Sequence, residues 1–310
     1  MWIQALVLIV SLLVLAWSAD KFVDGACGVA KFFGISPFLI GMVIVGFGTS
    51  APEMLVSATS ALSGSPDIAL GNAYGSNIAN IALILGVAAI VNPIKVDKSL
   101  MKKELPFLLL TIPLTVVLIL DGQISRIDAV ILLAVFLVIM VISSLGKKEE
   151  LAEEAENGEK VSIFKPLFLL VFGLALLISS SKALVWAAQG IAVQLGISEL
   201  IIGLTIVALG TSLPELASSV SAARKNEHEV AFGNVVGSNL FNTLCVVGIA
   251  AAIAPVASDP KILLRDIPLV SVLTLLLFVF AARQKISRFS GVLLVAVYFT
   301  YNTLLALGII

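Results

Sequence analysis

The chain has 310 residues, of which 59% are hydrophobic and only 13% are charged, and its formal net charge is −1. Its mean hydropathy is +1.12, whereas a soluble globular domain typically carries about 25% charged residues. The composition excludes an ordinary soluble domain, and the near-neutral charge gives no sign of a nucleic acid as partner.

Apolar blocks recur along the whole chain, and a block of about 20 residues can cross a hydrocarbon core about 30 Å thick. We therefore expect an all-α polytopic membrane protein with ten transmembrane helices and the lipid bilayer as its surroundings. The predicted helices cover residues 2–30, 37–62, 68–90, 104–120, 127–145, 164–192, 199–222, 230–252, 266–282 and 289–308.

Two motifs occur twice, each time 162 positions apart. GTSAPE at 48–53 returns as GTSLPE at 210–215, and GNAYGSNIAN at 71–80 returns as GNVVGSNLFN at 233–242. A single offset for both motifs predicts two structural copies of five helices each. The predicted parts are a first five-helix repeat at 1–146, a short acidic cytoplasmic linker at 147–163 and a second five-helix repeat at 164–310.

Two copies of an odd number of helices must have opposite orientations in the bilayer, which is the inverted 5+5 plan of many secondary transporters. The Lys and Arg residues of the loops lie after odd-numbered helices, with Arg126, Lys261 and Arg265 as the exceptions. Because positive loops stay inside, we expect both termini to be extracellular and the protein to be a multi-pass protein of the cell inner or plasma membrane.

The GTSAPE motif predicts a cation site. Pro52 lacks an N–H and Gly46 favours local unwinding, so backbone carbonyls become free inside the membrane. With the hydroxyls of Thr49 and Ser50 and the carboxylate of Glu53 they form an all-oxygen set, which suits Ca²⁺ and Na⁺. The second copy offers the same groups at Ala208, Thr211, Ser212, Pro214 and Glu215.

The second motif adds further candidate ligands. Ser76 and Asn80 are four residues apart and share one helix face, as do Ser238 and Asn242. We interpret these four residues as part of the site. The other asparagines of the two repeated motifs face elsewhere and are interpreted as interhelical hydrogen-bonding residues. They are Asn72, Asn77, Asn234 and Asn239.

A lone carboxylate at the membrane centre costs roughly 2.5–3.5 kcal/mol, and two facing carboxylates also repel. Protonation, a lysine partner such as Lys21 or Lys182, or a bound cation would relieve this cost, and we favour a cation held between Glu53 and Glu215. One Ca²⁺, two Na⁺ or two H⁺ would each neutralise the pair, and that competition is a sufficient basis for exchange.

The paired motifs closely resemble the two α-repeats of the calcium/cation antiporter superfamily, and within it the prokaryotic sodium/calcium exchangers. The resemblance implies a secondary active antiporter that exchanges Ca²⁺ for Na⁺ by alternating access, with no enzymatic activity and no cofactor. It also implies four central cation sites, three Na⁺ per Ca²⁺, and first and sixth helices that slide past a core of the second, third, seventh and eighth.

By motif position, the resemblance assigns the Ca²⁺ site to the carboxylates of Glu53 and Glu215 and the carbonyls of Thr49 and Thr211. It assigns the Na⁺ sites to two mirror sets with an asparagine pair between them. These sets are Gly46, Ser50 and Ser76, then Ala208, Ser212 and Ser238, then Asn80 and Asn242.

Two departures from relatives carry predictions. Some relatives, including the potassium-dependent branch, have Asp where this chain has Asn242, so we expect no potassium co-transport. Animal relatives carry a large regulatory insert between the halves, whereas the linker at 147–163 is too short for a calcium-sensing domain.

Other functions remain as alternatives. An H⁺/Ca²⁺ antiporter would use the same glutamate pair, although the serines favour Na⁺. An intramembrane hydrolase would need a YD or GxGD motif or histidines in the helices, which the sequence lacks. A channel fits repeated, broken helices less well than alternating access does.

Overall fold

The computed structural model describes residues 2–102, 104–145, 162–195 and 208–309. Within this part of the chain the fold is helical apart from four strands of two residues each. Eight of the described helices are long and apolar enough to cross a membrane. They are Trp2–Phe33, Pro37–Leu62, Ile68–Val91, Arg126–Ser144, Phe164–Gln194, His228–Ile253, Ile262–Ala282 and Arg288–Ala306.

The two remaining predicted helices are shorter or only partly described. The fourth corresponds to α7 (Glu104–Ile119), which has 16 residues. The seventh corresponds in its described part to α12 (Ala208–Thr211) and α13 (Leu213–Arg224). The predicted linker at 147–163 lies almost wholly outside the described residues. Ten transmembrane helices therefore stay a prediction.

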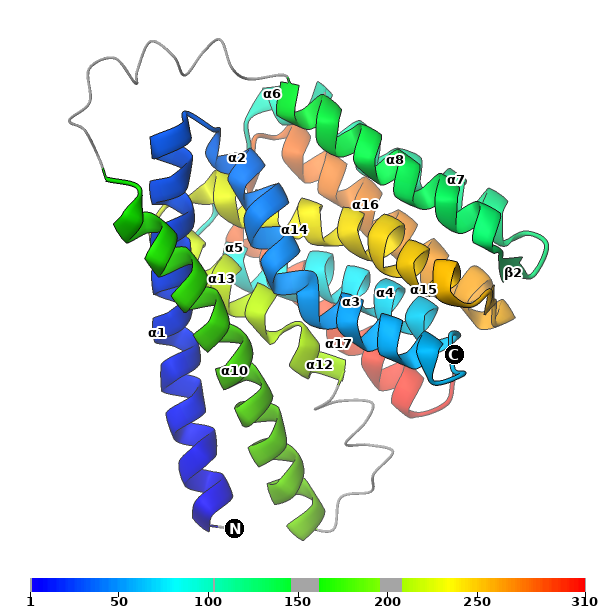
Figure 1. The fold of residues 1–310 in the computed structure, drawn as a ribbon, viewed down its shortest axis with the longest axis horizontal. Helices are drawn as coiled ribbons and strands as arrows, with labels where there is room; N and C mark the ends of the chain where they lie inside the picture. The colour runs from blue at the N-terminus through cyan, green and yellow to red at the C-terminus, as the bar shows by residue number, and fades with distance from the viewer. Residues whose placement is uncertain (1, 103, 146–161, 196–207, 310) are drawn as a thin grey trace.

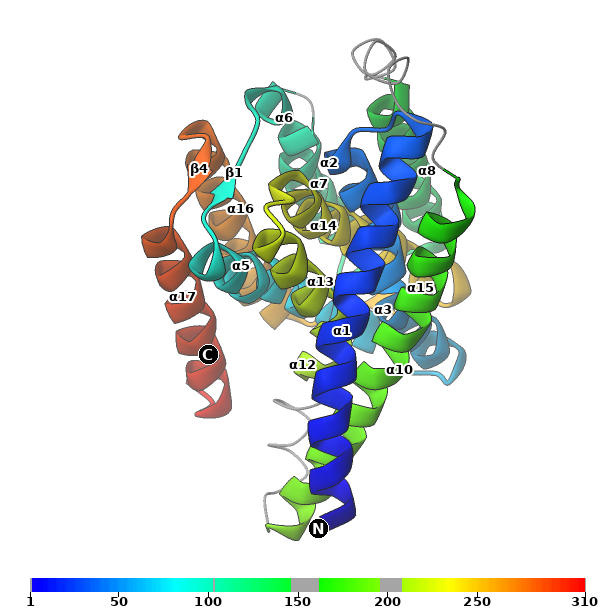
Figure 2. The same cartoon turned by 90° about the vertical axis from the view of Figure 1, so that its left-hand side faces the viewer.

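Helices α1 (Trp2–Phe33) and α10 (Phe164–Gln194) pack along each other and form a pair at one side of the bundle (Figures 1 and 2). Their backbones approach so closely that a Cβ atom at Gly25 would collide with the backbone of Leu170. Small residues permit such close packing of membrane helices, where dispersion contacts replace the hydrophobic effect. The pair can therefore behave as one packed unit beside the rest of the protein.

The central helices are interrupted by π-helical turns, which are frequent at functional sites. One helix is built from α2, η1 and α3, and two others from α4–η2–α5 and α14–η4–α15. Their bounds are α2 Pro37–Ile40, η1 Gly41–Val45, α3 Gly46–Leu62, α4 Ile68–Ile78, η2 Ala79–Ile84, α5 Leu85–Val91, α14 His228–Leu240, η4 Phe241–Val246 and α15 Val247–Ile253. Both bounds of η4 and of α15 lie 162 positions after those of η2 and α5.

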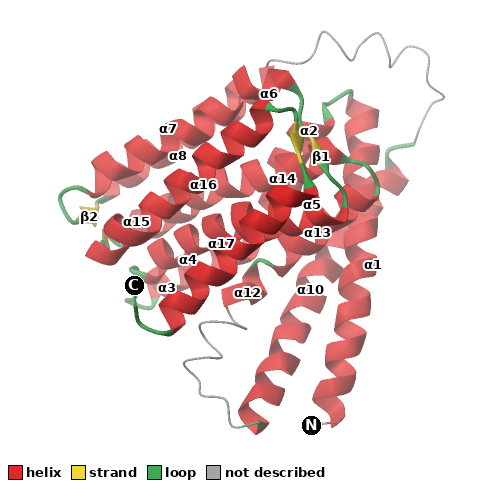
Figure 3. Cartoon of the chain, turned by 180° about the vertical axis from the view of Figure 1, so that it is seen from behind, coloured by secondary structure: helices red, strands yellow, loops and turns green. Residues whose placement is uncertain are grey.

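Outer helices complete the bundle around these central helices (Figure 3). They are α6 Lys98–Lys102, α7, α8 Arg126–Leu145, η5 Ile262–Asp266, α16 Ile267–Ala282 and α17 Arg288–Ala306. The two central spans, Ile68–Val91 and His228–Ile253, are the most buried, whereas outer helices such as α8 and α17 expose apolar side chains. An apolar exterior of this kind suits hydrocarbon as the surrounding solvent.

Two short antiparallel strand pairs join the halves of the chain at opposite ends of the bundle (Figure 3). Strand β1 (Ile94–Lys95) pairs with β4 (Lys285–Ile286), and β2 (Gln123–Ile124) pairs with β3 (Val256–Ala257). Each residue of one pair lies 162 positions from its counterpart in the other pair. The offset found in the sequence therefore recurs in the backbone pairing.

Candidate functional site

The two glutamates of the repeated motifs lie on helices with different backbones. In the first copy α3 continues through Pro52, which stands inside the helix. In the second copy the helix is interrupted at Ser212, whose φ of −87° and ψ of 4° separate α12 from α13. The local unwinding predicted at Gly46 is therefore absent from the first copy. Proline removes one hydrogen bond but tolerates helical dihedral angles, so the motif alone does not force a break.

Glu53 and Glu215 are both buried, with 1% and 2% of their surface exposed. Two carboxylates buried in one protein interior repel each other unless positive charge or protons balance them. The Ser50 hydroxyl donates a hydrogen bond to Oε1 of Glu215 at 3.2 Å. The carboxylate of Glu215 therefore meets a hydroxyl group from the other half of the chain.

Several buried oxygen atoms of the predicted site residues have no hydrogen-bond partner. They are both carboxylate oxygens of Glu53, Oε2 of Glu215, Oγ of Ser212, Oγ of Ser238 and Oδ1 of Asn242. A buried polar atom without a partner is costly, and nearly all such atoms in native proteins are satisfied. Unsatisfied oxygen atoms of this kind, among them carboxylate oxygens, are what a cation with oxygen ligands would satisfy.

The lysine candidates do not neutralise the glutamates. Among the described residues, the ion pairs join Lys225 to Asp24 and Arg265 to Asp266. The ammonium group of Lys21 instead lies over the Trp17 ring, 5.9 Å from its centroid. The structure thus leaves a bound cation or protonation as the means of balancing the two carboxylates.

The structure brings most of the other predicted ligands into this interior. The buried members are Gly46, Thr49, Ser50, Ser76, Asn80, Ser212, Ser238 and Asn242, whereas Thr211 is half-buried. Gly46 of α3 packs against the backbone of Gly237 and Ser238 in α14, so the two halves meet there. Ala208 is the first residue of α12. The assignment of each residue to a particular ion stays a prediction.

Two supporting residues were not assigned to the site from the sequence. The amide of Asn72 donates to the backbone carbonyl of Glu53 at 3.2 Å and to Ser57 at 2.9 Å. The amide of Asn234 donates to the carbonyl of Glu215 at 3.3 Å and also to two serines, Ser218 and Ser219. Their equivalent places in the repeated GN dipeptide were the signal that could have identified them as supports for the glutamates.

Asn234 has one further partner that Asn72 lacks among the described contacts. The hydroxyl of Thr49 lies 3.2 Å from Oδ1 of Asn234, which ties α3 to α14. Of the other two asparagines, Asn77 donates to Thr243 across the halves, as expected, at 2.8 Å. Asn239 instead donates to Val235 in its own helix.

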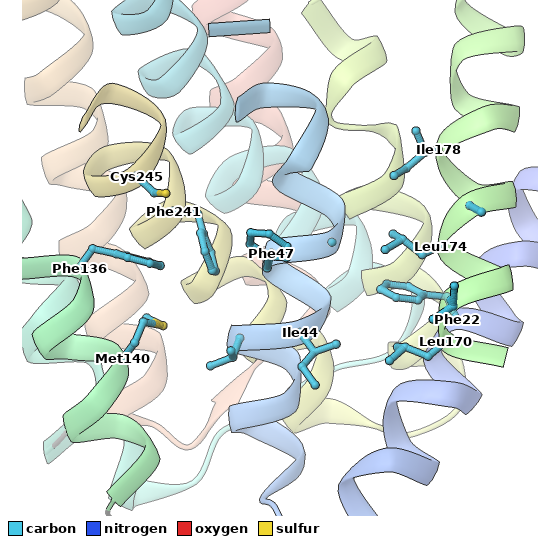
Figure 4. A pocket seen from close by; sticks show the side chains of 14 residues that line it. Phe22, Ile44, Phe47, Phe136, Met140, Leu170, Leu174, Ile178, Phe241 and Cys245 are labelled. Atoms are coloured by element: carbon cyan, nitrogen blue, oxygen red, sulfur yellow. The ribbon is translucent and has the colours of Figure 1, made fainter. Parts of the chain in front are cut away.

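Two cavities flank α10, and they differ in chemistry. One, of about 650 Å³, lies between α10 and the helices α3 and α8, and its lining is apolar (Figure 4). Phe22, Phe47 and Phe136 are among the side chains that line it. The other, of about 270 Å³, is lined by Ser181, Lys182 and Gln189 of α10 and reaches Pro52, Thr211 and Pro214. Only the second joins polar side chains to the glutamate motifs.

Comparison with known proteins agrees with this geometry. The family model described as "Sodium/calcium exchanger protein" matches residues 3–145 and 165–307. The chain belongs to the sodium/calcium exchanger family. The resemblance of its motifs to the calcium/cation antiporter superfamily is thereby confirmed, and its family consists of membrane transporters rather than enzymes.

Relatives in this family match the chain over nearly its whole length. A putative antiporter, CaxA, from Alkalimonas amylolytica is 39% identical over 98% of the chain and 99% of the relative. The sodium/calcium exchanger MaX1 from Methanosarcina acetivorans is 30% identical over 98% of each. The solved structure of the sodium-calcium exchanger NCX_Mj, soaked with zero Na⁺ and Ca²⁺, superposes with a TM-score of 0.84 at 34% identity. The superposition covers 96% of this chain and 97% of the NCX_Mj chain.

Proposed function

We propose that the protein is a secondary active antiporter that exchanges Ca²⁺ for Na⁺ across the cell membrane. The observation that carries this proposal is the buried pair of Glu53 and Glu215, which comes from both halves of the chain and has no lysine partner among the described residues. Membership of the sodium/calcium exchanger family supports it, as does the chain-wide similarity to the exchanger MaX1.

Charge balance supplies the mechanism of exchange. Two carboxylates at this depth are stable only when about two positive charges are bound, because an uncompensated charge in hydrocarbon is costly. One Ca²⁺ meets that need, and so do two Na⁺. Ions that share one pair of carboxylates cannot all bind at full strength. Loading with Na⁺ on one side therefore releases Ca²⁺ there. The site changes the side of the membrane to which it opens only when it is occupied.

We assign the ligands as the motif positions suggest. Ca²⁺ would be held by Glu53 and Glu215 with the carbonyls of Thr49 and Thr211. Ser50, Ser76, Ser212 and Ser238 would hold Na⁺ with the carbonyls of Gly46 and Ala208, and Asn80 and Asn242 would line the centre. The unpartnered oxygens of Ser212, Ser238 and Asn242 support this assignment, because each has an acceptor left for an ion.

We further infer an inverted repeat of two five-helix halves with both termini extracellular. The matching bounds of η2 and η4 and the matching strand pairs support two equivalent halves. The two segments matched by the family model are separated by the same 162 positions. In such a design, exchanging the conformations of the two halves converts a site open to one side into a site open to the other.

A Ca²⁺/H⁺ antiporter is the second candidate, because protons can neutralise the same two carboxylates. The abundance of hydroxyl and carbonyl oxygens around the glutamates favours Na⁺, since a proton needs no such cage. We also propose that no cofactor is needed and that transport proceeds without a regulatory calcium-binding domain in this chain.

The test is Ca²⁺ uptake by liposomes that contain the purified protein. An outward Na⁺ gradient at equal pH should drive uptake, and a pH gradient without Na⁺ should not. Uptake driven only by the pH gradient would replace the Na⁺ proposal with the proton one. Flux that needs neither gradient and does not saturate with Ca²⁺ would indicate a channel.

A further inference from the structure

Helix α1 contacts α13, and helix α10 contacts α3, through different kinds of bonds. On the side of α1 and α13, the Ser221 hydroxyl donates a hydrogen bond to Oδ1 of Asp20 at 2.5 Å. The ammonium of Lys225 donates to the backbone carbonyl of Asp20 at 2.7 Å and to Oδ1 of Asp24 at 2.6 Å. Two acidic residues of α1 are thus fastened to the end of α13, at the face that carries the Lys- and Arg-rich loops.

The equivalent contact between α10 and α3 has no such fastening. In the alignment of the halves that pairs Lys21 with Lys182, Asp20 corresponds to Ser181 and Asp24 to Val185. Ser221 and Lys225 correspond to Thr59 and Ser63, so that side has no ion pair to form. Ser181 donates instead to the carbonyl of Gly210 at 2.9 Å. A cavity of about 270 Å³ lies on each side, one between α10 and α3 and one between α1 and α13, so the difference between the sides is in the bonds and not in the cavities.

We propose that Asp20, Asp24, Ser221 and Lys225 form a gate that closes the ion path on the Lys- and Arg-rich face of the transporter. The gate rests on the alternating access of the proposed function but does not depend on which ions are exchanged. When the halves exchange conformations, α1 separates from α13 and the three bonds break. Because the corresponding positions of α10 and α3 carry Ser181, Val185, Thr59 and Ser63, they cannot form the same ion pair. The gate therefore stabilises one of the two states alone.

The size of this bias follows from exposure. The side chains of Lys225 and Asp24 are 28% and 44% exposed, so water screens much of their attraction. Ion pairs of this kind contribute modestly, and removing this one should change the ratio of the two states about two- to fivefold. A gate of that strength holds the face closed without trapping the transporter, since the cycle must open it at each turnover.

Accessibility of introduced cysteines can measure that ratio directly. The background carries Cys27→Ser and Cys245→Ser, which remove both native thiols. Ala217→Cys reports on the closed face, because Ala217 lines the crevice between α1 and α13 beside Asp20 and Ser221. Val56→Cys reports on the other face, because Val56 lines the cavity between α10 and α3. Each is labelled in vesicles of known orientation with a membrane-impermeant maleimide.

Lys225→Gln should speed the labelling of Ala217→Cys about two- to fivefold and slow that of Val56→Cys, because opening one face closes the other. Asp24→Asn should act in the same direction but less strongly, since Lys225 keeps its bond to the Asp20 carbonyl. In Lys225→Arg both reporter cysteines should be labelled at the same rate as in the parent. Arg283→Gln is the matched control, because it removes an exposed cation that does not line the crevice and has no ion pair among the described residues.

Unchanged labelling in both Lys225→Gln and Asp24→Asn would overturn the gate. Faster labelling at both reporters would also overturn it, because it would show a loosened fold instead of a shift between two states. The two variants lie on different helices, so a folding defect in one leaves the other as the test. Labelling requires no ion gradient. A shift in labelling without Na⁺-driven uptake would therefore contradict the Na⁺ proposal and leave the gate intact.

Discussion

Ser50 of the first half donates a hydrogen bond to the carboxylate of Glu215 in the second half, across 3.2 Å and 165 positions of sequence. The site therefore exists only when both halves are packed together, and neither motif builds it alone. A hydroxyl group that bonds to one oxygen of Glu215 leaves the other oxygen free for a cation. This geometry leads to predictions in which the two halves respond differently to equivalent substitutions.

Ser50→Ala should weaken the apparent affinity for Na⁺ about threefold to tenfold, because it removes a hydrogen bond to a charged group and a proposed Na⁺ ligand. The measurement is the Na⁺ dependence of Ca²⁺ uptake. Ser60→Ala, on the same helix but without a described side-chain hydrogen bond, is the control and should behave like the parent. Equal Na⁺ affinity in Ser50→Ala and the parent would remove Ser50 from the site.

Asn234→Ala should destabilise the folded protein more than Asn72→Ala. Asn234 is fully buried and supports Glu215, Ser218, Ser219 and Thr49, whereas Asn72 is half-buried and has two described partners. Leaving buried groups without partners costs about 1–3 kcal/mol each. We expect a loss of about 2–4 kcal/mol for Asn234→Ala and about 1–2 kcal/mol for Asn72→Ala. Thermal unfolding in detergent measures which variant loses more stability. A larger loss for Asn72→Ala than for Asn234→Ala would contradict the prediction.

Lys21→Gln should leave Ca²⁺ affinity and exchange within about twofold of the parent. Its ammonium group contacts Trp17 and makes no described ion pair with either glutamate, so its charge does not balance the site. A cation–π contact of this kind is worth about 0.5–1 kcal/mol at an exposed site, so a small loss of stability is expected. A tenfold change in Ca²⁺ affinity would instead support neutralisation of the glutamates by lysine.

Replacing K⁺ by choline on both sides of the membrane should leave Na⁺-driven Ca²⁺ uptake unchanged. The centre of the site offers the amide of Asn242, which is buried and carries no charge to balance a further cation. Asn242→Asp should raise the apparent affinity for cations and slow turnover, because a third carboxylate keeps the loaded site negative. A K⁺ requirement in the unmodified protein would contradict this account of the central charge.

The sequence predicted the membrane class and the burial of the motifs well, because both depend on local composition. The 162-residue offset predicted two structural copies, and the π-helical turns at Ala79–Ile84 and Phe241–Val246, which were not predicted, lie at that offset. It did not predict that α3 would continue through Pro52 while its counterpart is interrupted at Ser212. Two nearly identical motifs can differ in this way only because tertiary contacts decide between backbone states of similar energy.

The gate could not be found from the repeats, because it is the feature in which they differ. Asp24 and Lys225 are 201 positions apart, and neither has a charged counterpart in the other half. The supports Asn72 and Asn234 were visible as a repeated dipeptide, but their partner is a backbone carbonyl. Side-chain patterns do not indicate which carbonyl an amide will reach.

Equilibrium binding of radioactive Ca²⁺ to the purified protein tests the central claim most directly, because it asks whether Glu53 and Glu215 hold the exchanged ion. We predict saturable Ca²⁺ binding that rising Na⁺ displaces. Glu53→Gln and Glu215→Gln should each reduce the affinity for Ca²⁺ at least a hundredfold while the fold is retained. Ca²⁺ binding that Na⁺ leaves unchanged, or that either folded variant keeps at the parent's affinity, would contradict the account.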